Sequence, residues 1–295
     1  MATAKQIPAI YHKPPPGIPI DPIVNTRRIA GTHLPETWLH LFHYLEYRDQ
    51  RLNWIGCLGF VGFFLGFVGI FLTGSVTAFV FFAFLMIVIS LLTITLANLA
   101  KRPEMASRLT KSVLPIVRIL RADMRPGVPI TLWIDLNGAE MPKKQVNRVD
   151  HGDAKNTIDT FYIHRWLVGK ARLADRSQVQ WQITDYLRNR STTFRRTGGR
   201  VKTKVKPKTK MVINLWLNVP MRLYPNVTAT PTQTSDNKLH LKEKPRYISI
   251  RLKQKYRYAQ PGISVHLFRQ TIGQAYRQIT PPQQSVSYTG ATRVL

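Results

Sequence analysis

The stretch RVKTKVKPKTKMVINLWLNV, residues 200–219, has a period of two in its side-chain character. Its odd positions from 213 onward are apolar, and its even positions up to 210 are basic. The basic residues are Arg200, Lys202, Lys204, Lys206, Lys208 and Lys210. Because successive side chains of a β-strand point to opposite faces, the pattern predicts one long strand. Its apolar half belongs to a sheet, and its basic half projects as one arm of a β-ribbon.

A second basic stretch lies upstream and predicts the other arm of this ribbon. It contains Arg188, Arg190, Arg195 and Arg196. Gly198-Gly199 follows as a turn, because glycine accepts a positive φ at little cost. No Asp or Glu occurs between Asp185 and Asp236. The predicted ribbon is therefore strongly basic.

The alternation recurs within residues 245–257. Basic side chains hold odd positions, namely Arg251, Lys253, Lys255 and Arg257, and apolar side chains such as Ile250 hold even positions. Two strands with the same alternation predict one cationic sheet face. Cations two residues apart in a strand lie roughly 6.7 Å apart. That distance is close to the phosphate spacing of a nucleic-acid strand and to the packing of lipid headgroups, so spacing alone does not choose between them.

Other period-two patterns predict strands over 128–136, 161–173 and 178–187, with a turn at Asp175-Arg176-Ser177. Residues 222–243 are expected to form a long loop. Helical spacing from Val265 to Ile279 predicts a closing helix, and residues 281–295 are expected to be a disordered tail. Residues 124–280 therefore predict a β-rich domain. Five or more antiparallel strands with little helix between them are typical of a β-sandwich or an open, barrel-like sheet.

Residues 54–100 read WIGCLGFVGFFLGFVGIFLTGSVTAFVFFAFLMIVISLLTITLANLA and contain no Asp, Glu, Lys, Arg or His. A bilayer core accommodates roughly 20 apolar residues per helical crossing. The segment therefore predicts a two-helix transmembrane hairpin with a turn at residues 73–77. Glycines on the first helix favour close helix packing; they are Gly59, Gly62, Gly66 and Gly69. Packing against the second helix of the same chain is favoured over a dimer interface.

The segments beside the hairpin have their own signatures. Residues 1–31 are rich in proline and predict a disordered arm. Residues 32–53 predict an amphipathic helix at the membrane interface, with an apolar stripe of Trp38, Leu41, Phe42 and Leu45. Residues 101–123 predict a basic juxtamembrane helix. Basic residues flank the hairpin while its turn is uncharged, which predicts an inner (cytoplasmic) membrane with both termini cytoplasmic.

These patterns together predict an α+β membrane protein: a two-helix transmembrane hairpin plus a cytoplasmic, antiparallel β-sandwich-like domain with a long basic β-ribbon. The chain contains 43 Lys and Arg against 15 Asp and Glu, a formal net charge of +28. Almost all of the excess lies after residue 100. An imbalance of this size indicates an anionic partner.

The expected partner is an anionic phospholipid or an acidic protein. Nucleic acid is a weaker alternative, because single-strand binders usually set aromatic rings among their charges and residues 200–210 contain none. Tyr247, Tyr256 and Tyr258 keep that alternative open. Alternating Lys and Arg can also simply protect an edge strand from aggregation.

The predicted function is that of a non-enzymatic integral membrane protein whose basic domain binds an anionic membrane surface or acidic partner. The alternatives are a structural subunit of a larger membrane complex or homo-oligomer, and a membrane-tethered nucleic-acid-binding protein. A Walker loop, a G-x-S-x-G elbow and an H-E-x-x-H helix are missing from the sequence. Asp150-His151-Gly152-Asp153 is better explained as a polar turn, and His40 and His43 lack a matching ligand. No catalytic site, cofactor or metal is predicted.

Overall fold

The computed structural model describes residues 9–51, 108–152, 156–195, 200–224, 237–258, 265–277 and 279. The chain divides into two compact units. One, here the helical unit, comprises Met1–Thr26 and Pro35–Arg118, and the other, the sheet unit, comprises Arg27–Leu34 and Ile119–Leu295. All described residues of the predicted basic site belong to the sheet unit.

The helical unit buries the apolar stripe that was expected to lie at a membrane interface. Its described elements are η1 (Ala9–His12), α1 (Ile20–Thr26), a helix over residues 35–51, the π-helical turn η2 (Leu109–Val113) and the first half of α5 (Leu114–Ala122). Trp38, Leu41 and Phe42 have no exposed surface. Arg118 of α5 donates a hydrogen bond to His43 Nε2 at 3.0 Å. The interfacial helix predicted over 32–53 is therefore corrected, since the same amphipathic pattern serves a protein core.

The proline-rich segment, predicted to be a disordered arm over residues 1–31, contains regular structure in its described part. Tyr11 lies 5.3 Å from the ring of His40, and His12 stacks on Tyr47 with ring centroids 4.0 Å apart. Pro22 falls in the first turn of α1, where a missing N–H costs no helical hydrogen bond. Proline content alone therefore gave the wrong prediction.

Residues 108–122 are helical and lie within the segment predicted as a basic juxtamembrane helix. Leu109 and Val113 of η2 and Leu120 of α5 are buried. The apolar side of this helix therefore packs inside the protein, whereas the prediction placed it on a lipid surface.

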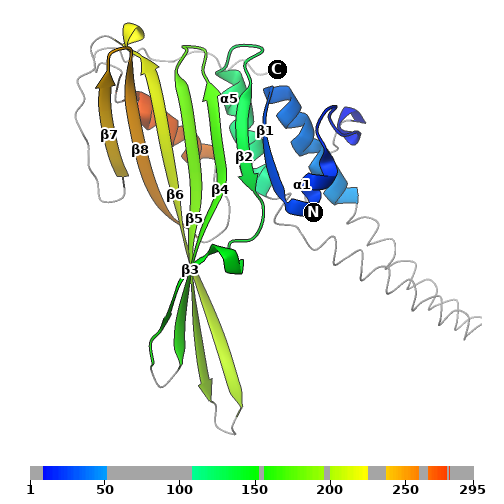
Figure 1. The fold of residues 1–295 in the computed structure, drawn as a ribbon, viewed down its shortest axis with the longest axis vertical. Coiled ribbons are helices and arrows are strands. Elements are labelled where there is room, and N and C mark those ends of the chain that lie inside the picture. Colours follow the sequence, from blue (N-terminus) through cyan, green and yellow to red (C-terminus); the bar gives the residue numbers. More distant parts are fainter. Residues whose placement is uncertain are drawn as a thin grey trace, which may run out of the picture. The chain divides into compact units, whose positions relative to one another are not determined.

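The sheet unit is built on one antiparallel sheet with the order β1-β2-β4-β5-β6-β8-β7, and β3 pairs with β4 (Figure 1). The strands are β1 (Arg28–His33), β2 (Ile130–Asp135), β3 (Gln145–Asp150), β4 (Thr157–Arg172), β5 (Gln178–Arg195), β6 (Val201–Pro220), β7 (Asn237–Lys244) and β8 (Tyr247–Tyr258). Short 3-10 turns η3 (Pro142–Lys144) and η4 (Met221–Leu223) connect some of them. Strand β1 completes the sheet from the N-terminal side by pairing with β2.

One face of the sheet is apolar and is covered by helix α6 (Val265–Arg277). Phe268 of α6 meets Trp181 of β5 edge to face, with ring centroids 5.6 Å apart. Gln254 of β8 is buried and hydrogen bonded to Thr271 and Gln274 of the same helix. From residue 213 onward on β6, its odd positions lie on this helix-covered face together with the odd positions of β5 and the even positions of β8 that pair with it. The period-two pattern predicts that they share one side.

Strands β4, β5 and β6 continue beyond this covered region as a ribbon (Figure 1). The ribbon comprises residues 157–162, 188–195 and 201–208, with β3 paired along the β4 arm. We call the remainder of the sheet the body. Strand β8 pairs with β6 only from Thr209 onward, so residues 201–208 form an edge, a position that tolerates Pro207. The arms of the predicted ribbon are therefore paired, and the Gly198-Gly199 turn lies outside the described residues.

Several local predictions are confirmed, and one loop is not. The predicted strands correspond to β2, β4, β5, β6 and β8, and the closing helix corresponds to α6. At the β4–β5 turn, the Asp175 carboxylate accepts hydrogen bonds from the Ser177 N–H at 2.8 Å and hydroxyl at 2.7 Å. Strand β7 occupies part of the predicted loop 222–243.

The predicted fold class is wrong as a whole. A β-sandwich has two packed sheets. Here the described strands form one sheet, and the amphipathic helix α6 supplies the second layer on its apolar face. In the ranges that the structure describes, no helix combines the length and apolar character needed to span a bilayer. The membrane-protein class, its integral-membrane function and its inner-membrane localisation are corrected accordingly. Residues 54–100, with the four packing glycines, lie outside the described residues.

Candidate anion-binding face

The register between β6 and β8 places the two predicted basic rows on one side of the sheet. Lys210 pairs with Arg257, and Lys253 pairs with Asn214. Directly paired residues of antiparallel strands point to the same side, and here that side is opposite the helix-covered face. We call it the cationic face. Its predicted members are Arg188, Arg190, Lys202, Lys204, Lys206, Lys208, Lys210, Arg251, Lys253, Lys255 and Arg257.

Three predicted site residues are not part of this arrangement. Arg200 is exposed and precedes the first residue of β6. Arg195 pairs with Val201 rather than with one of the even, basic positions of β6. Arg196 lies outside the described residues. The cationic face is therefore smaller than the predicted set at the tip of the ribbon.

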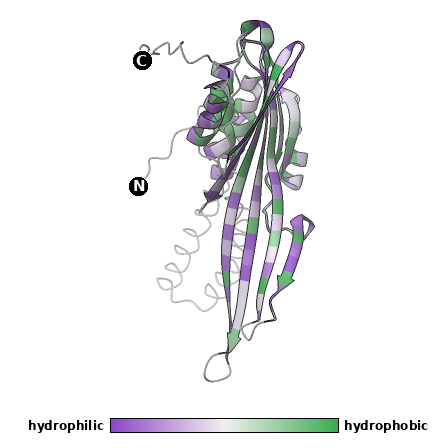
Figure 2. Cartoon of the chain, turned by 90° about the vertical axis from the view of Figure 1, so that its left-hand side faces the viewer, coloured by the Kyte–Doolittle hydropathy of each residue, from purple (hydrophilic) through white to green (hydrophobic). Residues whose placement is uncertain are grey.

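Within the ribbon and at its junction with the body, the strands align in rungs, each with one residue from β4, one from β5 and one from β6. Going outward from the body, the rungs are Ile163–Tyr186–Lys210, Phe161–Arg188–Lys208, Asp159–Arg190–Lys206 and Thr157–Thr192–Lys204. Successive rungs lie roughly 6.7 Å apart. Hydrophilic positions recur along these strands in Figure 2.

Asp159 neutralises part of this charge at the centre of the ribbon. Its carboxylate accepts hydrogen bonds from Arg190 Nε and Nη2, both at 3.0 Å, and from Arg188 Nη2 at 2.6 Å. His151 Nε2 lies 2.7 Å away. The two guanidinium groups and the imidazole hold the pKa of Asp159 well below its usual range. The carboxylate is covered by these partners and is 2% exposed, although the ribbon around it has no core.

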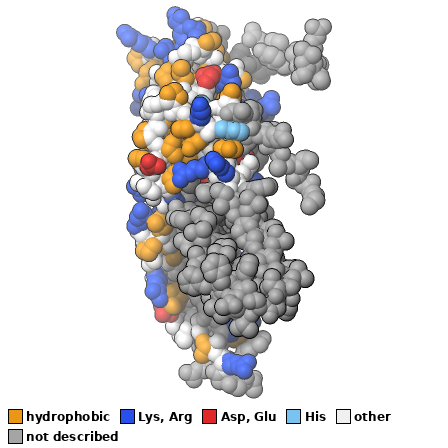
Figure 3. Space-filling view, turned by 90° about the vertical axis from the view of Figure 1, so that its right-hand side faces the viewer, with side chains coloured by type: hydrophobic (Ala, Val, Ile, Leu, Met, Phe, Trp, Pro, Cys, Tyr) orange, Lys and Arg blue, Asp and Glu red, His pale blue; other side chains and the backbone are white. Residues whose placement is uncertain are grey.

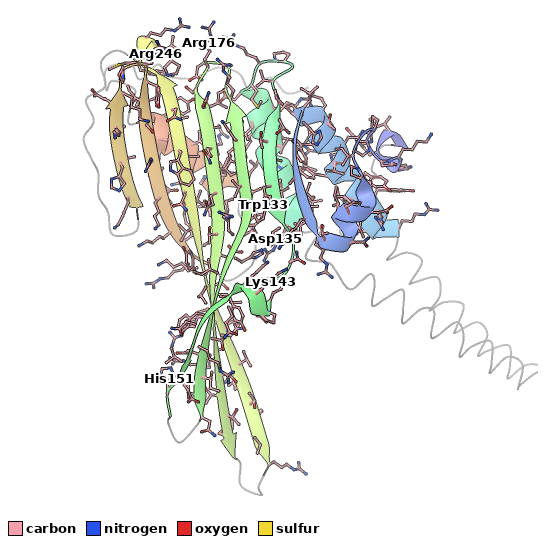
Figure 4. All side chains as sticks on the ribbon, viewed as in Figure 1. Trp133, Asp135, Lys143, His151, Arg176 and Arg246 are labelled. Atoms are coloured by element: carbon pink, nitrogen blue, oxygen red, sulfur yellow. The ribbon has the colours of Figure 1, made fainter. Side chains whose placement is uncertain are left out.

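Asp135, the second carboxylate that shares the parity of this face, is also occupied. It accepts hydrogen bonds from Asn137 Nδ2 at 2.7 Å and lies 3.1 Å from Lys144 Nζ. Burial raises the pKa of Asp135, but the hydrogen bonds from Asn137 and Lys144 outweigh burial and lower it overall. In Figure 4 Asp135 lies near the end of the body and His151 farther along the ribbon. Neither carboxylate is left to compete with an incoming anion.

Among the charged side chains visible in Figure 3, Lys and Arg are more common than Asp and Glu. Strand β7 extends the cationic face with residues that the sequence reasoning missed. They are Lys238, His240, Lys242 and Lys244, paired with Lys253, Arg251, Ser249 and Tyr247. The signal was present as a period-two alternation in NKLHLKEK, with Leu239 and Leu241 between the basic residues. The long loop predicted for 222–243 concealed it.

Aromatic side chains lie on the cationic face between the basic ones. Tyr186 is 39% exposed, and Phe161, Phe194 and Trp216 are partly exposed. The Arg188 guanidinium lies over the Phe161 ring, 5.8 Å from its centroid. Residues 200–210 contain no aromatic residue, so the rings alternate with the charges across the strands. The sequence of one strand alone therefore does not show that aromatic rings accompany its charges.

Two hollows open on the ribbon. The larger, of about 870 Å³, has aromatic and aliphatic walls with basic residues among them; its lining includes Val146, Phe161, Ile163, Tyr186, Arg188, Lys208, Lys210 and Arg257. The smaller, of about 410 Å³, is mainly polar and is lined by His151, Thr157, Arg190, Thr192, Phe194, Lys204 and Lys206. Arg188 lines the first and Arg190 the second, so the Asp159 cluster connects them.

The weaker chemical candidates make local contacts in the described part of the chain. Asp150 Oδ1 accepts a hydrogen bond from the Gly152 N–H at 3.0 Å, as in a polar turn, and Asp153 lies outside the described residues. His40 Nε2 lies 3.0 Å from the Lys13 carbonyl oxygen, whereas His43 contacts Arg118. Among the described residues, no group of three His, Cys, Asp or Glu is placed to hold a metal ion.

Comparisons of the chain with protein-family models, with curated proteins and with solved structures found no match. Its site is therefore interpreted from its own geometry.

Proposed function

We propose that the cationic face binds single-stranded nucleic acid, chiefly through its phosphates and with little sequence preference. The observation that supports this most strongly is that aromatic and basic side chains stand next to each other on the same rungs. Tyr186 stands beside Lys210, and Phe161 stands beside Arg188 and Lys208. Single-strand binders combine a positive surface that follows the backbone with aromatic rings on which bases stack.

The charge distribution favours a polymer over a single small anion. Basic residues continue from the ribbon along β6 and β8 to β7, and the two carboxylates of this face are already neutralised. A polyanion that neutralises several such cations releases its condensed counterions, which makes binding strong and salt-dependent. The same arrangement offers one small anion no enclosed site with comparable gain.

Anionic phospholipid and acidic protein are the competing partners, because both satisfy the same cations. Neither requires the partly exposed rings of Tyr186, Phe161 and Phe194 between those cations. A nucleic-acid strand uses both the cations and the rings, since its phosphates are anionic and every base has a face that can stack. The aromatic rings therefore decide between partners that charge alone leaves equivalent.

The test is fluorescence anisotropy of a labelled single strand titrated with the full chain over a salt series. Duplex of the same sequence, polyglutamate and phosphatidylserine vesicles serve as competitors. We expect the single strand to bind most tightly, with log K falling linearly against log salt at a slope of about −0.7 per phosphate contact. Stronger binding of polyglutamate or vesicles would refute the proposal.

A matched pair of variants separates the face from the overall charge. Lys204→Gln/Lys206→Gln removes two positive charges from the cationic face. Val201→Glu/Val205→Glu changes the net charge by the same amount on the opposite side of the same strand, where both side chains are exposed. We expect the first variant to reduce the magnitude of the salt slope by about 1.4. The second leaves the slope nearly unchanged; equal effects of the two would contradict the proposal.

A further inference from the structure

We infer that the larger hollow, here the Tyr186 groove, is a stacking subsite for a nucleobase. The inference rests on the proposed function and adds to it a place and a kind of contact. It also distinguishes this groove from the rest of the cationic face, where contacts to phosphate suffice.

The walls of the groove match the two parts of a nucleotide. Val146, Phe161, Ile163 and Tyr186 contribute apolar and aromatic side chains to its lining. Lys208, Lys210 and Arg257 lie at the same groove. A base requires a flat, apolar contact, while the phosphate attached to it requires a cation within a few ångströms. The volume of about 870 Å³ exceeds what one base fills, so the sugar and phosphate fit as well.

Tyr186 is the ring best placed to receive the base. It occupies the central strand β5, between Ile163 on β4 and Lys210 on β6. Its side chain is 39% exposed. Phe161, by contrast, already has the Arg188 guanidinium over its ring at 5.8 Å from the centroid. A base stacked on Tyr186 would therefore meet Arg188 as a neighbour held in place by Asp159.

The smaller hollow continues the same path along β5 and suits the next phosphate. Arg190, Lys204 and Lys206 line it together with the hydroxyl groups of Thr157 and Thr192. Charge-assisted hydrogen bonds from such groups are the usual contacts to phosphate oxygens. Arg188 and Arg190 are two residues apart, roughly 6.7 Å along the strand, which is close to the spacing of successive phosphates. The stacking subsite thus lies beside a phosphate site in the order that a single strand presents them.

The experiment compares a short oligothymidylate with an abasic strand of the same length and charge, each titrated with the full chain. We expect the full chain to bind the oligothymidylate about tenfold more tightly, because stacking adds to phosphate contacts. Equal affinity for the two strands refutes the subsite while leaving the proposed function intact. Failure to bind either strand at low salt refutes the proposed function itself.

Variants of the ring locate the preference. Tyr186→Ala is expected to remove most of the tenfold difference, and Tyr186→Phe is expected to retain it, because the stacking face is preserved. Neither changes the salt slope, since no charge is removed. Tyr247→Ala is the matched control, a tyrosine on the same face that pairs with Lys244 far from the groove. The subsite is refuted if Tyr247→Ala reduces the preference as much as Tyr186→Ala, or if Tyr186→Phe abolishes it.

Discussion

Strands β4, β5 and β6 each pass through two environments, the body and the ribbon. On β6, Leu215 in the body is 1% exposed, while Val205 in the ribbon, also at an odd position, is 56% exposed. The alternation of the sequence is the same in both halves. Helix α6 covers the body, and its Phe268 packs against Trp181 there. A period-two pattern therefore determines which side a residue faces, while a covering element determines whether that side is buried.

The ribbon consequently depends on interactions other than hydrophobic burial. Its arms are joined by the strand ladder, by the Thr193–Thr203 hydroxyl pair at 3.1 Å and by the Asp159 cluster. Regions with few buried apolar contacts open at lower free energy than the core. We expect the ribbon to open locally before the body unfolds, and the following predictions test that difference.

The largest expected effect is on the body. Leu215→Ala should lower the free energy of unfolding by about 2–5 kcal/mol, because it leaves a cavity beneath α6. Val205→Ala, at the same parity in the ribbon, should change it by less than about 0.5 kcal/mol. Urea unfolding of the two full-length variants measures both. Similar losses for the two would mean that the ribbon has a core of its own.

A close approach between strands of the body gives the next effect. A Cβ atom added to Gly169 would lie 2.1 Å from the Trp181 ring, so Gly169→Ala should destabilise the protein by about 1–3 kcal/mol through overpacking. Gly273 of α6 has no heavy atom within 4 Å of the corresponding Cβ position. Gly273→Ala should therefore stabilise by about 0.5–1 kcal/mol, because alanine is the better helix former. Thermal unfolding should give opposite signs for the two changes.

Asp159→Asn tests the charge cluster of the ribbon. It leaves Arg188 and Arg190 without their carboxylate, so backbone amides in 157–162 and 188–192 should lose protection from hydrogen exchange at pH 7. Protection in the body should change little. Exchange followed by mass spectrometry reads both regions in one sample, and equal losses in the two would argue that they unfold as one unit.

The same variant carries a pH prediction. Hydrogen bonds from Arg190 and Arg188 keep the pKa of Asp159 below its usual value. Its contribution to the ribbon is therefore fully present above the ordinary carboxyl pKa of about 3.9 and is lost as the pH falls below it. The difference in protection factors between the natural chain and Asp159→Asn should shrink as the pH falls below about 4. A difference that instead grows below about pH 4 would contradict this assignment.

The smallest expected effect is that of Lys204→Gln/Lys206→Gln on stability. Both side chains are exposed on the ribbon, so the free energy of unfolding should change by less than about 0.5 kcal/mol. Its melting temperature should therefore match that of the natural chain within error. A large loss would show that these lysines hold the ribbon together, and binding data on the variant would then need a stability correction.

Much of the sheet could be predicted because its side chains alternate. The apolar half of β6 and the parity of β8 predicted both the strands and the side each residue faces. The register that pairs Lys210 with Arg257 comes from the structure, since the sequence predicted only that the two strands share a cationic face. Local turn chemistry was equally readable, since Asp175 caps the β4–β5 turn with its own side chain.

The remainder required long-range information. Asp159 meets Arg190 across 31 positions of sequence, and only the β4–β5 register reveals that these two residues share a rung and that Arg188 lies on the neighbouring one. The identity of the layer over the apolar face could not be predicted either, because the same strand pattern is compatible with a second sheet or with a helix such as α6. Proline content predicted disorder in the N-terminal segment, although Ile23 and Ile29 of that segment are buried in the structure.

The Asp159 cluster has a thermodynamic consequence for any anion that meets the ribbon. An arginine side chain that is ordered only on binding loses up to about 2 kcal/mol of rotamer entropy. The carboxylate has already immobilised Arg188 and Arg190 during folding. Association at this cluster therefore incurs little of that entropic penalty, and a preorganised pair of guanidinium groups binds more tightly than its residual charge alone would suggest.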